Sequence, residues 1–167
     1  MALIPASLKD APELDAIVAF LRGLGIVVRE GALPDDCFVP GMTVRDGALI
    51  YDPLSPGWVG DLLHEGGHLA VTDPAIRATL PIVLHDPAEE MAALAWSYAA
   101  AMAIGLPIGT LFHAGYKGGP EYLINAFTQS SPIGLPMLQY WGMAACGDAV
   151  AAGEPAYPAM RTWLRTR

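Results

Sequence analysis

The sequence has few basic residues, and this limits the partners that it can bind. Of its 167 residues only nine are lysine or arginine, against seventeen acidic residues, so the net charge is −8. The lysines are Lys9 and Lys117, and the arginines are scattered along the chain. Because no basic patch can follow a phosphate backbone or an anionic lipid surface, we expect neither nucleic acid nor a membrane as a partner.

Cysteine is also scarce. Cys37 and Cys146 form no CxxC pair, so the sequence does not indicate a cysteine-based metal or redox site. Two isolated thiols are typical of a protein in a reducing compartment. The first residues, MALIPASLKDAPELD, have neither a basic region nor a long apolar region of the kind found in signal peptides. We therefore expect a cytoplasmic protein.

Charge is absent from one long segment, residues 91–116, apart from His113. Its length raises the question of a transmembrane helix. Against this, the segment is mostly alanine, Gly105 and Pro107 interrupt it, and Glu89 and Glu90 precede it where basic flanks would be expected. The segment is therefore interpreted as a buried helix of a globular protein.

The composition favours one globular domain over residues 1–167. Apolar residues make up 53% of the chain, which is enough for a sizeable core and is consistent with self-association into a homo-oligomer. Residues 12–25 have the apolar spacing of a helix, whereas residues 26–52 are β-branched and punctuated by glycine, proline and aspartate. The pattern predicts an α+β fold in which a small antiparallel sheet packs on two long helices.

The first long helix carries the motif HEGGH, His64 to His68. Ser55 and Pro56 are suited to its first positions, and it should end near Thr72. Two histidines four residues apart lie on one helix face, one turn apart, where both can bind one zinc ion. Glu65 stands beside them as a candidate general base for a zinc-bound water. This H-E-x-x-H pattern indicates a zinc-dependent hydrolase.

A catalytic zinc needs a third protein ligand. The metzincin position for a third histidine holds Pro74, so we expect a glutamate on the next helix, either Glu89 or Glu90. Asp86 is a good N-cap for that helix, and Glu89 then falls at the position that completes a capping box. Glu90 remains free to face the histidines and is the preferred ligand, with Glu89 as the alternative.

The motif HEGGH resembles the HExGH form of the gluzincin metallopeptidases. A strand, the HExxH helix and a second helix beginning EMAALA, over residues 48–107, are similar to the short gluzincins of the ImmA/IrrE type. The resemblance implies a zincin-like core, a Zn²⁺ ion held by His64, His68 and Glu90, and Glu65 as general base. It also implies a peptide or protein substrate, for which the strand in GALIYD, residues 47–52, would offer an edge.

Three further residues are candidate donors for the developing oxyanion of a hydrolysis reaction: His113, Tyr116 and Lys117 in FHAGYKGG. Tyr116 is preferred among them. Asp61, one turn before His64, is weighed as a residue that orients the second nitrogen of that histidine. The alternative function is that of a metal-binding or partner-binding protein without turnover, whose fourth metal position would be filled by the protein.

Overall fold

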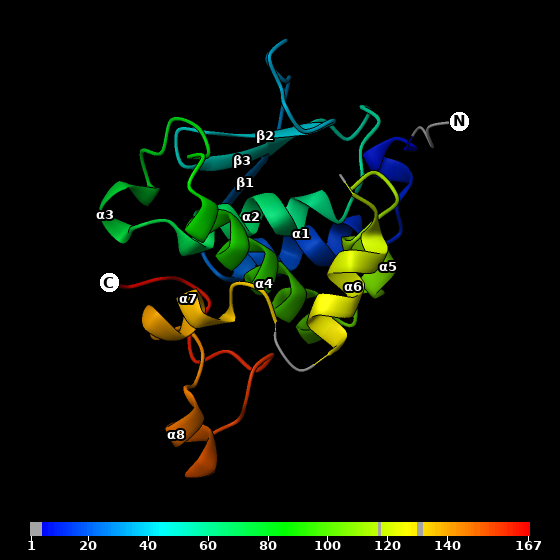
Figure 1. Ribbon diagram of the computed structural model, residues 1–167. Coiled ribbons are helices and arrows are strands. Elements are labelled where there is room, and N and C mark those ends of the chain that lie inside the picture. The colour runs from blue at the N-terminus through cyan, green and yellow to red at the C-terminus, as the bar shows by residue number, and fades with distance from the viewer. Residues whose placement is uncertain (1–4, 117, 130–131) are drawn as a thin grey trace.

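The computed structural model describes residues 5–116, 118–129 and 132–167. The fold is α+β: a small sheet lies along one side of a group of helices (Figure 1). The elements of the first half are a 3-10 helix η1 (Leu8–Asp10), α1 (Leu14–Gly23), β1 (Val27–Glu30), β2 (Met42–Arg45), β3 (Ala48–Tyr51) and α2 (Asp61–Val71). Those of the second half are α3 (Pro74–Arg77), α4 (Pro87–Ile104), α5 (Ile108–Leu111), α6 (Pro120–Thr128), α7 (Leu135–Tyr140) and α8 (Gly147–Ala151).

The sheet is mixed, and the prediction of an antiparallel sheet was wrong for one of its pairings. Its strand order is β1–β3–β2, with β2 antiparallel and β1 parallel to β3. A two-residue turn at Asp46 and Gly47, both with positive φ, joins β2 to β3. This turn places β2 on one side of β3, and β1 occupies the other side, where it runs parallel to β3. Residues 36–41, which were expected to be extended, form turns between β1 and β2.

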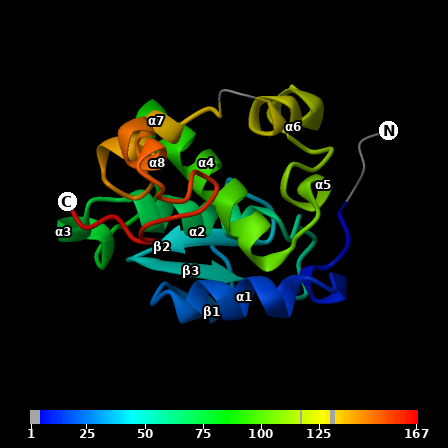
Figure 2. The ribbon, with the colours of Figure 1, turned by 90° about the horizontal axis from the view of Figure 1, so that it is seen from below.

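Helix α2 is the centre of the core. It lies between α4 on one side and the sheet with α1 on the other (Figures 1 and 2). The two glycines of HEGGH permit this close packing. A Cβ atom on Gly66 would lie 2.6 Å from Cδ2 of Leu21 in α1, and one on Gly67 would lie 3.0 Å from the carbonyl oxygen of Ala93 in α4. Glycine therefore lets both neighbouring helices approach the motif, as a packed site requires.

The start of α2 differs from the prediction. The helix begins at Asp61, not near Pro56. Pro56 instead forms a bridge with Ser7, and the Ser55 hydroxyl donates a hydrogen bond of 2.6 Å to the Asp52 carboxylate rather than capping the helix. The predicted end near Thr72 agrees with the structure, because Thr72 follows the last helical residue and its hydroxyl donates to the carbonyl of His68.

Helix α4 begins where the sequence predicted, but the expected capping box is not formed, because the Glu89 carboxylate lies against Arg165 and not at the backbone N–H of Asp86. The side chain of Asp86 accepts hydrogen bonds from the backbone N–H groups of Ala88 and Glu89, and Pro87 occupies the first turn. The helix ends at Gly105 in the left-handed conformation. None of the helices within the described ranges combines the length and hydropathy that a membrane span needs.

The C-terminal segment, residues 152–167, contacts α2, the helix that carries the HEGGH motif. The backbone N–H of Arg165 donates to the carbonyl of Ala70 at the end of α2. Nearby, Trp163 packs edge-on against Trp96 of α4 and Phe20 of α1, and its carbonyl accepts a hydrogen bond of 2.8 Å from the Trp96 indole. This segment thus contacts the helix that carries the motif and the helix that carries Glu90.

Candidate metal centre

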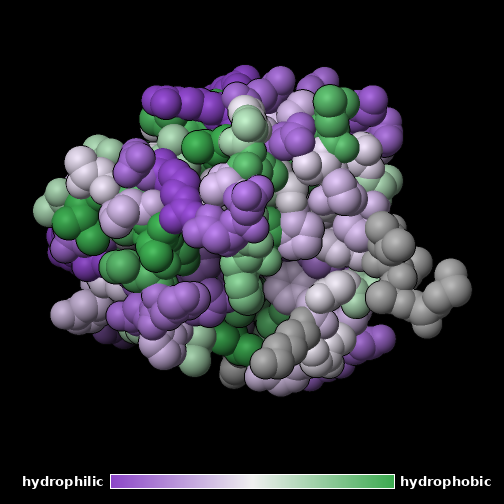
Figure 3. Space-filling view, turned by 90° about the horizontal axis from the view of Figure 1, so that it is seen from above, coloured by the Kyte–Doolittle hydropathy of each residue, from purple (hydrophilic) through white to green (hydrophobic). Residues whose placement is uncertain are grey.

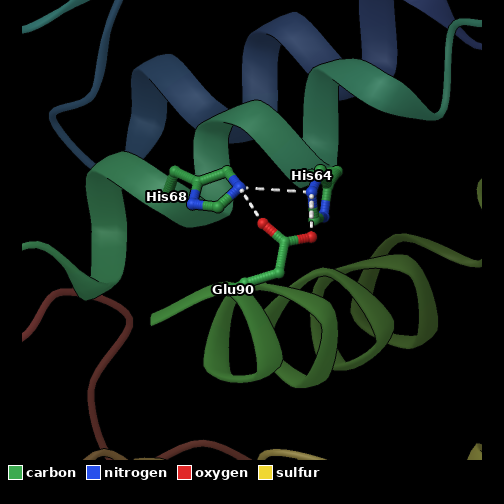
Figure 4. Close-up of side chains that lie close together, drawn as sticks. All are labelled: His64, His68 and Glu90. Carbon is green, nitrogen blue, oxygen red and sulfur yellow. Dashed lines mark hydrogen bonds and ion pairs between the residues drawn. The ribbon is translucent and has the colours of Figure 1, made fainter. Parts of the chain in front are cut away.

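Three side chains converge between α2 and α4. His64 and His68 point their Nε2 atoms at each other across 3.2 Å. The Glu90 carboxylate reaches them from α4, with Oε1 3.2 Å from Nε2 of His64 and Oε2 3.0 Å from Nε2 of His68 (Figure 4). The second glutamate of the helix, Glu89, points elsewhere: its Oε1 lies 3.5 Å from Nη1 of Arg165.

The spacing of these atoms suits a metal ion. The donor atoms of the three residues all lie within 4.8 Å of one another. Adjacent nitrogen and oxygen ligands of a tetrahedral zinc ion, each about 2.0–2.2 Å from the metal, lie about 3.3 Å apart. The observed separations of 3.0–3.2 Å are close to this value. Because the possible ligand atoms of the three residues lie this close together, this His-His-Glu group can bind a metal ion.

The burial of the group leaves one side accessible. The side chains of His64 and His68 are 12% and 5% exposed, whereas that of Glu90 is 51% exposed. All three line a cavity of about 610 Å³ that is also lined by Glu65, Tyr116 and the four residues of β2. A metal ion held here would therefore face a space large enough for water and a ligand.

The protonation of the group in the metal-free protein follows from its contacts. Burial lowers the pKa of His64, but the hydrogen bond to Glu90 and the charges of Glu65, Glu90 and Asp61 outweigh burial, so this pKa is raised. The hydrogen bonds from His64 and His68 hold the pKa of the Glu90 carboxyl well below its usual range. A proton thus binds His64 more readily than a free histidine, and a metal ion must displace it.

Glu65 lies next to the histidines and faces the same cavity. The residue is 7% exposed. Burial raises the pKa of its carboxyl, and the nearby His64 and His68 partly oppose that effect. A carboxylate whose proton affinity is raised is better suited to take up and release a proton near neutral pH than an exposed glutamate.

Asp61 and His113 form a buried pair, which corrects two interpretations of the sequence. Nε2 of His113 lies 2.8 Å from Oδ1 of Asp61, and its Nδ1 accepts a hydrogen bond from the backbone N–H of Gly115. The Nε2 atom therefore carries the proton and donates a hydrogen bond to Asp61. Trp58 stacks on the His113 ring with centroids 4.4 Å apart. Asp61 thus does not orient His64, and His113 has no free donor for an oxyanion.

Tyr116 is the remaining donor candidate among the described residues, since Lys117 lies outside them. The Tyr116 hydroxyl is buried and has no hydrogen-bond partner among the described residues, and the same is true of Nδ1 of His64. The two rings meet edge-on with centroids 6.4 Å apart. Burial, followed by the charge of Asp61, raises the pKa of Tyr116. The hydroxyl therefore stays protonated and can donate.

The wall of the cavity opposite α2 was missed by the sequence interpretation. It is formed by β2, the preceding turns and the segment 82–85 that leads into α4. One sequence signal was present: LPIVLHDP, residues 80–87, has apolar residues immediately before a helix N-cap, where a polar loop is usual.

Comparison of the chain with protein-family models, with curated proteins and with solved structures gives no match.

Proposed function

We propose that this protein is a zinc-dependent hydrolase with a zincin-like core, and that its substrates are peptides or proteins. The observation that carries the proposal is the convergence of His64, His68 and Glu90 at one point of a cavity, with Glu65 beside them. Two imidazole nitrogens and one carboxylate are a donor set typical of catalytic zinc sites, which keep one position open.

In the proposed reaction, the metal ion and the protein side chains would have separate roles. A zinc ion in such a site lowers the pKa of a bound water to about 7 and polarises a carbonyl oxygen. Glu65 would take the proton of the attacking water and later deliver it to the leaving amine, because its buried carboxyl has a raised pKa. His64, His68 and Glu90 would hold the ion through ligand atoms that already lie close together.

Tyr116 would stabilise the negative charge that develops on the carbonyl oxygen. The residue lines the same cavity, and its buried hydroxyl is protonated and has no partner among the described residues. A donor that is held in place before the reaction loses no energy in reorganisation. His113 is not assigned this role, since both of its ring nitrogens already form hydrogen bonds.

A strand edge beside the site supports a peptide substrate. The edge expected in residues 47–52 does not exist, because β3 is paired on both sides. The edge strand is β2, whose four residues line the cavity. An extended peptide can add to such an edge by backbone hydrogen bonds, which gives affinity without dependence on sequence.

The deciding experiment compares the wild-type protein with Glu65→Gln. Both should bind about one zinc ion per chain, because Glu65 is not a ligand. Only the wild type should cleave members of a peptide library, read by mass spectrometry at neutral pH, and the loss in Glu65→Gln should reach several orders of magnitude. Glu121→Gln, an exposed change outside the cavity, is the matched control.

Two results would overturn the proposal. If zinc-loaded wild type cleaves nothing in the library, the protein is a metal-binding or partner-binding protein without turnover. If Glu65→Gln cleaves as fast as wild type, the assigned base is wrong.

A further inference from the structure

The cavity at the candidate metal centre extends between β2 on one side and the segment 82–85 on the other. We infer that it accepts an extended peptide segment that has large apolar side chains and is flanked by basic residues. This inference rests on the proposed function and specifies its substrate class. Three observations support it: the free edge of β2, the exposed apolar side chains along the cavity, and the charges of the lining.

The first observation concerns the backbone of β2. Because the turn between β2 and β3 has two residues, the backbones of Arg45 and Ala48 form a hydrogen-bonded pair. Hydrogen-bonded and non-hydrogen-bonded pairs alternate along an antiparallel ladder. Thr43 is therefore bonded to Ile50, while the N–H and C=O of Val44 point away from β3. Within the described residues, no turn or loop segment forms a backbone hydrogen bond with Val44. An extended segment can pair with this strand edge.

The second observation is the apolar lining. Phe38 is 93% exposed, and Ile82 and Leu84 are 44% and 45% exposed, yet all three line the cavity. Phe38 precedes β2, whereas Ile82 and Leu84 precede α4, so the exposed side chains come from two separate segments. On the face that carries β2, apolar patches lie exposed between hydrophilic side chains (Figure 3). Large side chains of a bound segment would be covered from both segments.

The third observation is charge. The charged side chains of the lining, histidines aside, are four carboxylates and one arginine: Asp36, Asp61, Glu65, Glu90 and Arg45. That arginine is already paired with Asp36 at 2.8 Å. A bound zinc ion would offset part of the negative charge of the lining, but the net charge of −8 on the chain exceeds the charge of the ion. Basic flanks on the bound segment are therefore attracted and acidic flanks are repelled. The same charge disfavours a second copy of this chain as the occupant.

The test uses the zinc-loaded Glu65→Gln variant, which binds without cleaving, and three fluorescent peptides. One has an apolar centre and basic flanks, the second has the same centre and acidic flanks, and the third has a serine- and glutamine-rich centre with basic flanks. Fluorescence anisotropy should show the first binding at least about tenfold more tightly than either of the others, as expected for burying one or two large apolar side chains.

Variants locate the binding surface. Adding Phe38→Ser and Leu84→Ser together should weaken binding of the first peptide about tenfold or more, since both side chains would lose apolar contact. Tyr122→Ser, at a side chain that is 67% exposed and outside the cavity, is the control and should leave binding unchanged.

The inference and the proposed function fail in different ways. Selective binding of the first peptide without cleavage by the wild type would overturn the proposed function alone. Cleavage of all three peptides at equal rates, or equal binding of all three, would overturn the inference alone. Sedimentation that shows a dimer which Phe38→Ser dissociates would assign the surface to a second copy and would also overturn the inference.

Discussion

Glu89 and Glu90 are adjacent in α4, yet their carboxylates contact different elements of the fold. The carboxylate of Glu90 bridges the Nε2 atoms of His64 and His68, whereas that of Glu89 lies against the Arg165 guanidinium. A helix rotates by about 100° per residue, so neighbouring side chains leave it in different directions. Because α4 packs against α2, the direction of Glu90 leads to the histidines and that of Glu89 leads to the C-terminal arginine.

The two glutamates should therefore respond differently to the same substitution. Glu90→Gln removes the only carboxylate of the triad and should lower zinc affinity by at least about tenfold, measured by calorimetric titration. Glu89→Gln should leave zinc affinity nearly unchanged and lower the free energy of unfolding by about 1–2 kcal/mol, because Arg165 loses its charged partner. The reverse pattern would show that Glu89 is the ligand.

The stability of the metal-free protein should depend on pH through His64 and Glu90. The raised pKa of His64 stabilises the metal-free fold below the usual histidine value of 6.5, and this contribution is lost as pH rises through the raised value. The lowered pKa of Glu90 stabilises that fold above 4.5, and this contribution is lost as pH falls through the lowered value. The metal-free pair thus contributes most between about pH 4.5 and 6.5.

Zinc competes with the His64 proton, so its affinity should rise from pH 5.5 to pH 8, by up to about tenfold per pH unit while one proton is displaced. Differential scanning fluorimetry with and without zinc should show a shift in melting temperature that grows over this range. A shift that stays constant across the range would mean that His64 does not bind the metal.

Tyr116→Phe should separate catalysis from stability. The Tyr116 hydroxyl is buried without a partner among the described residues, so its removal should not destabilise the fold by more than about 0.5 kcal/mol. If the hydroxyl stabilises the oxyanion, kcat should fall by about 10²–10³ while zinc content stays the same. An unchanged kcat would remove Tyr116 from the mechanism.

Arg77 should be a major contributor to stability. Its guanidinium donates to four carbonyl oxygens, those of Leu69, Ala70, Thr72 and Arg165. Arg77→Ala should lower the free energy of unfolding by about 2–4 kcal/mol, since it leaves carbonyls at the end of α2 without donors. Chemical denaturation measures this change. Arg161→Ala, which removes a surface ion pair with Glu154, is the control and should have little effect.

Local rules predicted the arrangement of the helices that bear the triad. The spacing of His64 and His68 predicted that they share one face of α2, and the capping residues Asp86 and Pro87 predicted where α4 begins. These signals lie within a few residues of the features that they determine. Glu90 faces the histidines as predicted, but the reason for preferring it was wrong, because Glu89 lies against Arg165 and does not close a capping box with Asp86. The role of Glu90 as a ligand stays a prediction.

Contacts between residues far apart in sequence could not be predicted, because no local sequence pattern indicates them. Asp61 pairs with His113 across 52 positions, so a helix-start aspartate was interpreted as a neighbour of His64. Pro56 pairs with Ser7 far upstream, which prevents it from starting α2. The parallel pairing of β1 with β3 also joins strands that are separated by β2 in sequence. In each case the prediction was wrong because a tertiary contact, which has no local sequence signal, decided the outcome.

The hydrogen bonds from Arg165 to the end of α2 have a consequence for the order of folding. Its side chain donates to the carbonyl of Val71 across 94 positions of sequence. Contacts that close such long loops form late, because the loss of chain entropy precedes their gain. The histidines and Glu90 lie much closer together in sequence. The contacts of the His-His-Glu group therefore close a shorter loop, and cost less chain entropy, than those that hold the C-terminal segment on α2.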